Sequence, residues 1–239
     1  MRLTGVGVGP GDPDLLTIKG RKLLRAADVV FVPVSAEGLP GYAEGVVLAH
    51  VDPAHVQRVV FALGGDADRG SSWNTAARQV AEVVGRSGHA AFATIGDPNL
   101  YSTFTYLAAT VRRLVPGVAI DTVPGITAFQ DLAARSGTVL AEGDQTLALL
   151  PFTAGRERLS TALAEHDTVV AYKGGRFLPE VRSVLAQAGR LDGAVLGARL
   201  GLNGETVGAL PAEGDAPYLS TVLVTRAVTA DRARPGSSA

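Results

Sequence analysis

The sequence predicts an α/β protein of two domains, the first with a mostly parallel β-sheet and the second with a mixed sheet. Short β-branched runs alternate with helical patterns through the first half, which is typical of parallel strands joined by helices. The pattern restarts around residues 116–125, and three strand-like runs near the C-terminus follow one another without helices. We therefore expect an N-terminal domain over 1–120, a C-terminal domain over 121–230 and a disordered tail over 231–239.

The composition limits the classes of protein to consider. The chain has 239 residues, of which 46% are hydrophobic and 19% charged, so it can bury a core. The net charge of −1 lacks the basic surplus of nucleic-acid-binding proteins, and no apolar run reaches the ~18 residues of a membrane span. The first residues show no apolar segment followed by a cleavage site, the pattern of a secretory leader. We expect a soluble cytoplasmic protein with neither nucleic-acid nor membrane partners.

Metal and thiol chemistry is not expected. The chain has no cysteine, which excludes disulfides, thiolate zinc sites and cysteine nucleophiles. Its histidines show no spacing typical of metal ligands, and Pro53 interrupts any helix between His50 and His55. We predict no metal bound by the protein itself.

In the first domain, apolar periodicity places strands and helices in alternation. Runs rich in β-branched residues predict strands over 3–8, 28–32, 59–63, 90–95 and 118–123. Apolar residues at helical spacing predict helices over 16–27, 73–84 and 104–115. Two glycine-rich stretches, 35–45 and 64–72, are expected to be loops.

In the second domain, the same criteria predict more strands than helices. Helices are expected over 126–134 and 178–188. Strands are expected over 146–150, 168–172, 195–200, 206–210 and 219–225. Because the last three have no helix between them, we expect hairpins and a mixed sheet.

The first motif that could carry chemistry is the sequence GVGVGPGDP over residues 5–13, at the end of the first predicted strand. Ligands of parallel sheets bind beyond the carboxyl ends of the strands, and glycine lets the backbone approach a ligand closely. The spacing fits a dinucleotide-binding turn poorly, because Pro13 interrupts the step into a helix. A tight structural turn is the alternative interpretation.

Two further motifs also follow predicted strands. The sequence GDPNLYS over 96–102 places Asp97 before a proline, which holds the chain extended and aims the carboxylate. The sequence PGITA over 124–128 opens a helix, where Thr127 can cap the first turn or donate to a ligand. An ordinary Asp-Pro turn and a plain helix cap are the alternatives.

Taken together and in this order, the three motifs resemble the signatures of the tetrapyrrole methylase family. The resemblance extends to LLTIKG at 15–20 and ADVV at 27–30, and it covers nearly the whole chain apart from the tail. Val8 departs from the smaller residue usual at its position. The stretch GDPNLYSTF at 96–104 is similar to the subgroup that methylates C20 of precorrin-2, as are segments 140–144, 172–176 and 199–201. The sequence YLS at 218–220 differs by one residue from the YFS common there.

The resemblance implies a two-domain fold, usually dimeric, with S-adenosylmethionine in an active cleft between the domains. The reaction converts this donor to S-adenosylhomocysteine. Most cofactor contacts would come from backbone groups. The residues that the family places at the cofactor are Pro10, Gly96, Asp97, Pro98, Tyr101, Ser102, Thr127 and Ala128.

The resemblance also implies the substrate, precorrin-2 or its cobalt forms (cobalt-precorrin-2 or cobalt-factor II), in cobalamin biosynthesis. The carbon C20 must lose its hydrogen after methylation, and Asp97 is the first candidate for the base. Lys173 and Tyr218 are candidates to orient the macrocycle or its carboxylates, although a solvated lysine after a strand is the alternative for Lys173. The substrate-binding set that we predict is Gly11, Asp12 and Arg176.

Other functions remain open from the sequence. A methylase of the same family could act at another precorrin position, on uroporphyrinogen III, on ribosomal RNA or on the diphthamide precursor, although RNA binding favours a more basic chain. A non-enzymatic α/β module that holds NAD is a further alternative. Stabilisation by S-adenosylhomocysteine but not by NAD would separate the first class from the last.

Overall fold

The computed structural model describes residues 1–61, 66–173 and 175–226. The chain divides into two compact units, Met1–Ala128 and Phe129–Ala239. The boundary expected between residues 120 and 121 falls inside a strand of the first unit, Ala119–Val123. The expected disordered tail over 231–239 lies outside the described residues.

The first unit contains one five-stranded sheet in which every pairing is parallel, in the order β3-β2-β4-β1-β5. The predicted α/β class with a parallel first sheet is therefore confirmed. β1 lies in the interior of this sheet, between β4 and β5, so the ends of these three strands are neighbours. The strands are β1 Arg2–Gly7, β2 Val29–Val34, β3 Val56–Val60, β4 His89–Thr94 and β5 Ala119–Val123.

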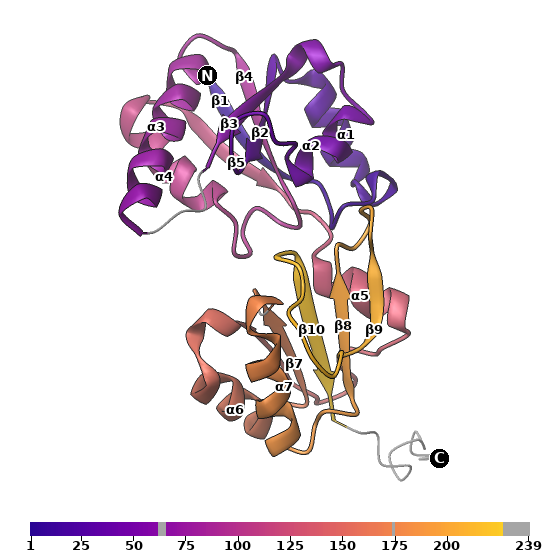
Figure 1. The fold of residues 1–239 in the computed structure, drawn as a ribbon. Coiled ribbons are helices and arrows are strands. Elements are labelled where there is room, and N and C mark those ends of the chain that lie inside the picture. Colours follow the sequence, from indigo (N-terminus) through magenta and orange to yellow (C-terminus); the bar gives the residue numbers. More distant parts are fainter. Residues whose placement is uncertain (62–65, 174, 227–239) are drawn as a thin grey trace. The chain divides into compact units, whose positions relative to one another are not determined.

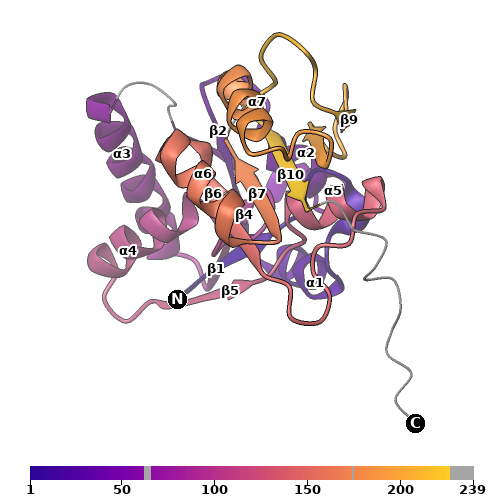
Figure 2. The same cartoon turned by 90° about the horizontal axis from the view of Figure 1, so that it is seen from below.

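Helices cover both faces of this sheet, as Figures 1 and 2 show. One face packs against α1 (Ile18–Ala26) and α2 (Tyr42–Leu48) through an aliphatic core that includes Val6, Leu24 and Val32. The other face packs against α3 (Asp66–Val84) and α4 (Phe104–Leu114). That second core is more aromatic, since it contains Phe31, Phe61, Phe92 and Phe104. Short 3-10 turns lie at Pro13–Leu15 and Pro53–His55.

Two predictions for the first unit were wrong in part. Residues 64 and 65 of the loop expected over 64–72 lie outside the described residues, and the rest of it is helical, because α3 begins at Asp66. The loop expected over 35–45 ends earlier, because α2 begins at Tyr42. Glu44 stabilises that helix start. Its carboxylate accepts a hydrogen bond from the Gly41 N–H (3.0 Å) and forms an ion pair with Arg58 (2.7 Å). At α2, glycine content alone therefore predicted a loop where a cap and a buried face stabilise a helix.

The second unit contains a mixed five-stranded sheet, as predicted, in the order β6-β7-β10-β8-β9. Only β6 and β7 are parallel, and the remaining pairs are antiparallel. The expected hairpins form in one case, β8–β9, whereas β10 lies between β7 and β8. The strands are β6 Leu147–Pro151, β7 Thr168–Tyr172, β8 Ala194–Ala198, β9 Thr206–Ala209 and β10 Ser220–Thr225.

Helices also lie on both faces of the second sheet (Figure 1). α6 (Arg156–Glu165) and α7 (Leu178–Gln187) pack on one face through the core of this unit. α5 (Ala128–Ser136) lies on the other face, where Leu132 packs so closely on Gly197 that an added Cβ would lie 2.7 Å away. The sequence did not predict α6, because only Leu159 and Leu163 of its ten residues are buried and its apolar face is narrow. Short 3-10 turns lie at Phe152–Ala154 and Gly175–Phe177.

The part of the chain that the structure describes lacks two features. None of its helices is long and apolar enough to cross a membrane. Within the same residues, no group of three or more His, Cys, Asp or Glu side chains is arranged to hold a metal ion.

His89 at the start of β4 should make the first unit sensitive to acid. Burial, together with the charge of Arg2, lowers the pKa of its imidazole below the usual value, against the opposing effect of Asp121 and Asp28. A histidine with a lowered folded-state pKa binds its proton more readily when unfolded. The stability that this supplies is complete above the unfolded pKa of about 6.5 and is lost as the pH falls below it.

We therefore expect the free energy of unfolding in urea to decrease from about pH 7.5 to about pH 5.5, and to decrease less in His89→Gln. The fluorescence of Trp73, the only tryptophan, reports on this unit because its ring packs 6.1 Å from Phe61. An equal decrease in both proteins would contradict the role assigned to His89.

Candidate active site

The first loop of the candidate site follows β1 and is almost completely buried. Residues 7 to 11 are all buried, and Gly9 has a φ of 85°, a left-handed conformation that favours glycine. Asp12 is partly exposed and accepts a hydrogen bond from the Asp14 N–H (2.9 Å), so it caps the 3-10 turn that follows. α1 starts only at Ile18, after this turn, and its N-terminus is capped by Thr17. The arrangement differs from a dinucleotide site, where the glycine turn leads directly into a helix.

The second loop follows β4 and is hydrogen-bonded to the first. The Gly96 N–H donates to the Gly9 carbonyl (2.8 Å), and the two residues form an isolated β-bridge. Gly96 has a φ of 69°, so glycine is favoured at this position as well. Gly96 and Pro98 are buried, and Asp97 between them is partly exposed.

The third loop follows β5 and lies directly against the other two. A Cβ added to Gly125 would lie 2.1 Å from the Gly96 carbonyl oxygen and 2.7 Å from the Gly7 Cα. A Cβ added to Gly7 would lie 2.5 Å from the same oxygen. Real Cβ atoms do not approach backbone this closely, so both positions require glycine. The three motifs that the sequence singled out therefore meet as backbone within one unit.

Asp97 holds the second and third loops together. One of its carboxylate oxygens accepts the Asn99 N–H (2.8 Å) and the other accepts the Gly125 N–H (3.0 Å). The Asn99 side chain donates to the Thr122 hydroxyl on β5 (3.1 Å). Hydrogen bonds to a carboxylate are among the stronger ones in proteins, so this residue fixes the geometry of both loops.

The other residues predicted for the cofactor lie around these loops. Pro10 belongs to the first loop and is buried, and Thr127 is buried just before α5, whose first residue is Ala128. The Ser102 hydroxyl lies 3.1 Å from the Thr94 hydroxyl and accepts the Phe104 N–H at the start of α4.

Tyr101 differs from these neighbours because it is exposed and strained. Its φ of 51° is left-handed, although it is not glycine, and 44% of the residue is accessible. Partial burial raises the pKa of its phenol above the ordinary value. Strained non-glycine residues cluster at functional sites, which is consistent with the predicted place beside a ligand.

The second unit brings together three other predicted residues. Lys173 follows β7, and Tyr218 precedes β10, which pairs with β7 through Tyr172 and Thr221. The turn at Gly175 is joined to the segment before β10 by a hydrogen bond from the Ala216 N–H to the Gly175 carbonyl (2.9 Å). Arg176 in this turn lies over the Phe177 ring at 4.7 Å. Lys173, Arg176 and Tyr218 are thus exposed at one end of the second sheet, whereas Gly11 and Asp12 belong to the first unit.

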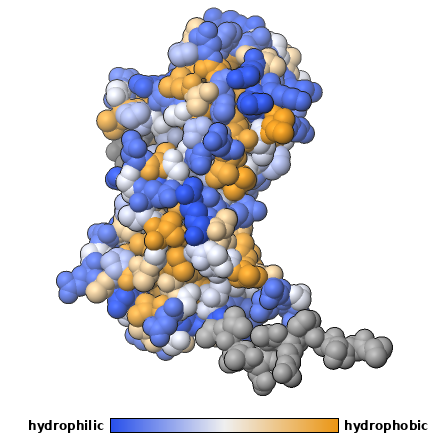
Figure 3. Space-filling view, turned by 90° about the vertical axis from the view of Figure 1, so that its right-hand side faces the viewer, coloured by the Kyte–Doolittle hydropathy of each residue, from blue (hydrophilic) through white to orange (hydrophobic). Residues whose placement is uncertain are grey.

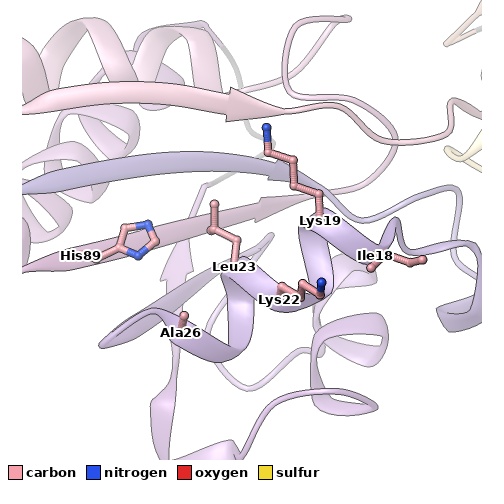
Figure 4. Close-up of a pocket in the computed structure, with 6 residues that line it drawn as sticks. All are labelled: Ile18, Lys19, Lys22, Leu23, Ala26 and His89. Atoms are coloured by element: carbon pink, nitrogen blue, oxygen red, sulfur yellow. The ribbon is translucent and has the colours of Figure 1, made fainter.

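A pocket of about 600 Å³ lies along α1 and is separate from the three loops. It is lined by Ile18, Lys19, Lys22, Leu23 and Ala26 of α1, with His89 contributed by β4 (Figure 4). None of the residues predicted for the cofactor lines it. Its position at the start of β4 is opposite to the strand ends, where parallel sheets bind ligands.

Exposed hydrophobic residues do not mark the site by themselves. Large apolar side chains reach the surface in both units, including Ile18, Tyr106, Val139 and Tyr218. On the face shown in Figure 3, hydrophobic residues are interspersed with hydrophilic ones. Such exposure is common on folded proteins, so the site is assigned from the loops instead.

Comparison with known proteins identifies the family. The profile of the tetrapyrrole (corrin/porphyrin) methylases matches residues 2–213. This chain belongs to that family. The resemblance predicted from the three motifs is therefore confirmed.

Individual relatives of this methylase cover nearly its whole length. A precorrin-2 C(20)-methyltransferase from a Sinorhizobium species is 35% identical, over 93% of this chain and 94% of the relative. A cobalt-precorrin-2 C(20)-methyltransferase from Salmonella typhimurium is 31% identical, over 94% and 96%. The crystal structure of a uroporphyrin-III C-methyltransferase from Thermus thermophilus, complexed with S-adenosylhomocysteine, has a TM-score of 0.67, with 21% identity over 94% and 97% of the two chains. The last similarity supports the fold alone.

The close contact of the three loops predicts a sharp difference between two glycines of this methylase. Gly125→Ala should lower the free energy of unfolding by at least about 2 kcal/mol, because the backbone atoms that the new Cβ meets cannot rotate away. Gly45→Ala is the matched control, since Gly45 lies exposed within α2 with nothing within 4 Å of an added Cβ.

The control should be neutral or stabilising by up to about 1 kcal/mol, because alanine is the better helix former. Urea unfolding followed by Trp73 fluorescence measures both variants. Equal stability of the two would show that the loops do not meet as described.

Proposed function

We propose that this chain is an S-adenosylmethionine-dependent methyltransferase that acts at C20 of precorrin-2, or of its cobalt form, in cobalamin biosynthesis. The observation that carries the proposal is the convergence of backbone segments 7–11, 96–101 and 124–128 at the carboxyl ends of β1, β4 and β5. The two relatives named for C20 methylation, at 35% and 31% identity over almost the whole chain, support the position on the macrocycle.

The residues at the three loops fit the proposed cofactor. Where Gly7 and Gly125 lack a Cβ, backbone lies against backbone, and this brings the peptide groups of three loops within reach of one ligand. Backbone N–H and C=O groups suit a neutral adenine and a methionine tail, which need several hydrogen bonds but no metal. We assign cofactor binding to Pro10, Gly96, Asp97, Pro98, Tyr101, Ser102, Thr127 and Ala128.

The bound cofactor supplies a sulfonium methyl group that is already activated for transfer. The task of the protein is then to orient donor and acceptor, which can contribute about 7–11 kcal/mol. Rigid loops suit this task, and Asp97 rigidifies two of them through its bonds to Asn99 and Gly125. In the second unit, Lys173, Arg176 and Tyr218 present two cations and a phenol that can hold the acidic macrocycle.

The proton that leaves C20 needs an acceptor. Asp97 stays our candidate, acting with the lone pairs that its two backbone hydrogen bonds leave free. Its role as a positioning residue rests on the hydrogen bonds that it accepts from Asn99 and Gly125. Proton transfer and loop positioning both use the carboxylate of Asp97. A substitution of Asp97 can separate the two roles, because loss of positioning weakens cofactor binding whereas loss of the base lowers turnover.

The family resemblance is also the basis on which we propose that the enzyme is a homodimer. The alternatives within the family differ in substrate, and an assay of methyl transfer distinguishes them.

With isotopically labelled S-adenosylmethionine and precorrin-2 under anaerobic conditions, we expect one labelled methyl group at C20 together with S-adenosylhomocysteine. Nuclear magnetic resonance of the product assigns the position. Label at C2, C7, C11 or C17 would reject the assigned carbon, and label found only in uroporphyrinogen III, ribosomal RNA or the diphthamide precursor would reject the substrate. Thermal stabilisation by NAD instead of S-adenosylhomocysteine would reject the methylase function itself.

Asp97→Asn should weaken binding of S-adenosylhomocysteine about tenfold, because the amide can accept only one of the two backbone hydrogen bonds and the charge is lost. Calorimetric titration measures the affinity, and Asp14→Asn is the control, since Asp14 is an exposed residue of the nearby 3-10 turn. Unchanged affinity with a large loss of kcat would instead assign Asp97 to proton transfer alone.

A further inference from the structure

Arg199 has a backbone conformation that sequence reasoning could not reveal. It directly follows β8 and has a φ of 52°, in the left-handed region that non-glycine residues rarely adopt. Its N–H donates to the Leu219 carbonyl just before β10 (2.9 Å), which fixes its position at the end of the sheet. The sequence marks residues 199–201 only as a segment similar to the C20 subgroup, and it does not indicate the φ of Arg199.

Lys173 has the same conformation at the corresponding end of β7, with a φ of 58°. β10 lies between β7 and β8, as Figure 1 shows. Its first residues pair with the last residues of both neighbours, Ser220 with Ala198 and Thr221 with Tyr172. Lys173 and Arg199 therefore occupy equivalent places at one end of the sheet, with backbones two strand spacings, or about 10 Å, apart.

The left-handed conformation has a cost that glycine would avoid. For a residue with a Cβ it is roughly 1–2 kcal/mol. The same turn uses glycine elsewhere, at Gly201 (φ 70°) and Gly204 (φ 80°), where backbone shape is all that is needed. An arginine with a left-handed backbone in a turn that otherwise uses glycine for this conformation is best explained by a use for its side chain.

The guanidinium of Arg199 is not needed to build its turn. Within residues 1–61, 66–173 and 175–226 it makes no hydrogen bond or ion pair, and it lies beside Gly204, where an added Cβ would be 3.2 Å from Nη1. Glu205 anchors the turn instead, by accepting the Gly201 N–H (2.6 Å) and an ion pair from Arg135 (2.8 Å). Both carboxylate oxygens of Glu205 are therefore engaged, and Arg199 is left exposed.

We propose that Arg199 binds a carboxylate of the tetrapyrrole, together with Lys173 at a second carboxylate of the same macrocycle. This assignment rests on the proposed function, because precorrin-2 carries eight carboxylates on short flexible arms. An arginine can hold a carboxylate with two parallel hydrogen bonds, whereas lysine acts as a point charge. A strained arginine at the end of β8 thus becomes a determinant of substrate affinity.

Arg199→Gly tests the assignment, because glycine relieves the backbone strain while it removes the guanidinium that would bind the substrate. We expect KM for precorrin-2 to rise about tenfold, while affinity for S-adenosylhomocysteine is unchanged and the melting temperature is unchanged or higher. Arg199→Lys should recover part of the affinity. Arg158→Ala is the matched control, since Arg158 is an exposed arginine on α6 of the same unit, and it should leave KM unchanged.

A binding assay separates failure of this assignment from failure of the proposed function. Fluorescence quenching of uroporphyrin III, an octacarboxylate probe that needs no turnover, should be weakened by Arg199→Gly and not by Arg158→Ala. A lower melting temperature with unchanged KM and unchanged probe binding would assign Arg199 to structure and overturn the proposal. If the wild-type enzyme did not methylate precorrin-2 but bound the probe more tightly than Arg199→Gly did, only the proposed C20 activity would be rejected.

Discussion

The structure of the candidate site depends on backbone packed directly against backbone. Gly7, Gly96 and Gly125 come from three strand ends, and the positions of Gly7 and Gly125 cannot admit even one methyl group. Such proximity is possible because β1 lies between β4 and β5 in a parallel sheet, so that the three chains leave the sheet at one edge. The hydrogen bonds from Gly96 to Gly9 and from Gly125 to Asp97 then fix the loops against one another.

A different device operates at the end of the second sheet. There the chain keeps side chains in conformations that glycine would adopt more easily, at Lys173 and Arg199. In the first unit, glycines at the loop contacts bring peptide groups close together. In the second unit, Lys173 and Arg199 have positively charged side chains on a left-handed backbone. Each arrangement suits the chemistry of its proposed ligand, since peptide groups can hydrogen-bond the adenosine and methionine parts of the cofactor, whereas positive charge attracts an acidic macrocycle.

Much of the fold followed from periodicity in the sequence. The alternation of apolar runs predicted the parallel first sheet and the mixed second one, because helical crossovers and short connections leave distinct patterns. The errors fell where the pattern was weak. α6 buries only two leucines, and α2 depends on the cap that Glu44 supplies from within the helix. The insertion of β10 between β7 and β8 left no local signal, because strand order depends on long-range pairing.

The sequence by itself determined the family and the three glycine motifs, since each motif is local and its residue types follow from turn geometry. Only the tertiary structure decided that Asp97 holds two loops together and that Arg199 is strained and exposed. The physical reason is that hydrogen bonds between loops and left-handed φ values arise from contacts between distant segments. A residue letter specifies which groups are available, and the folded chain specifies which partners they meet.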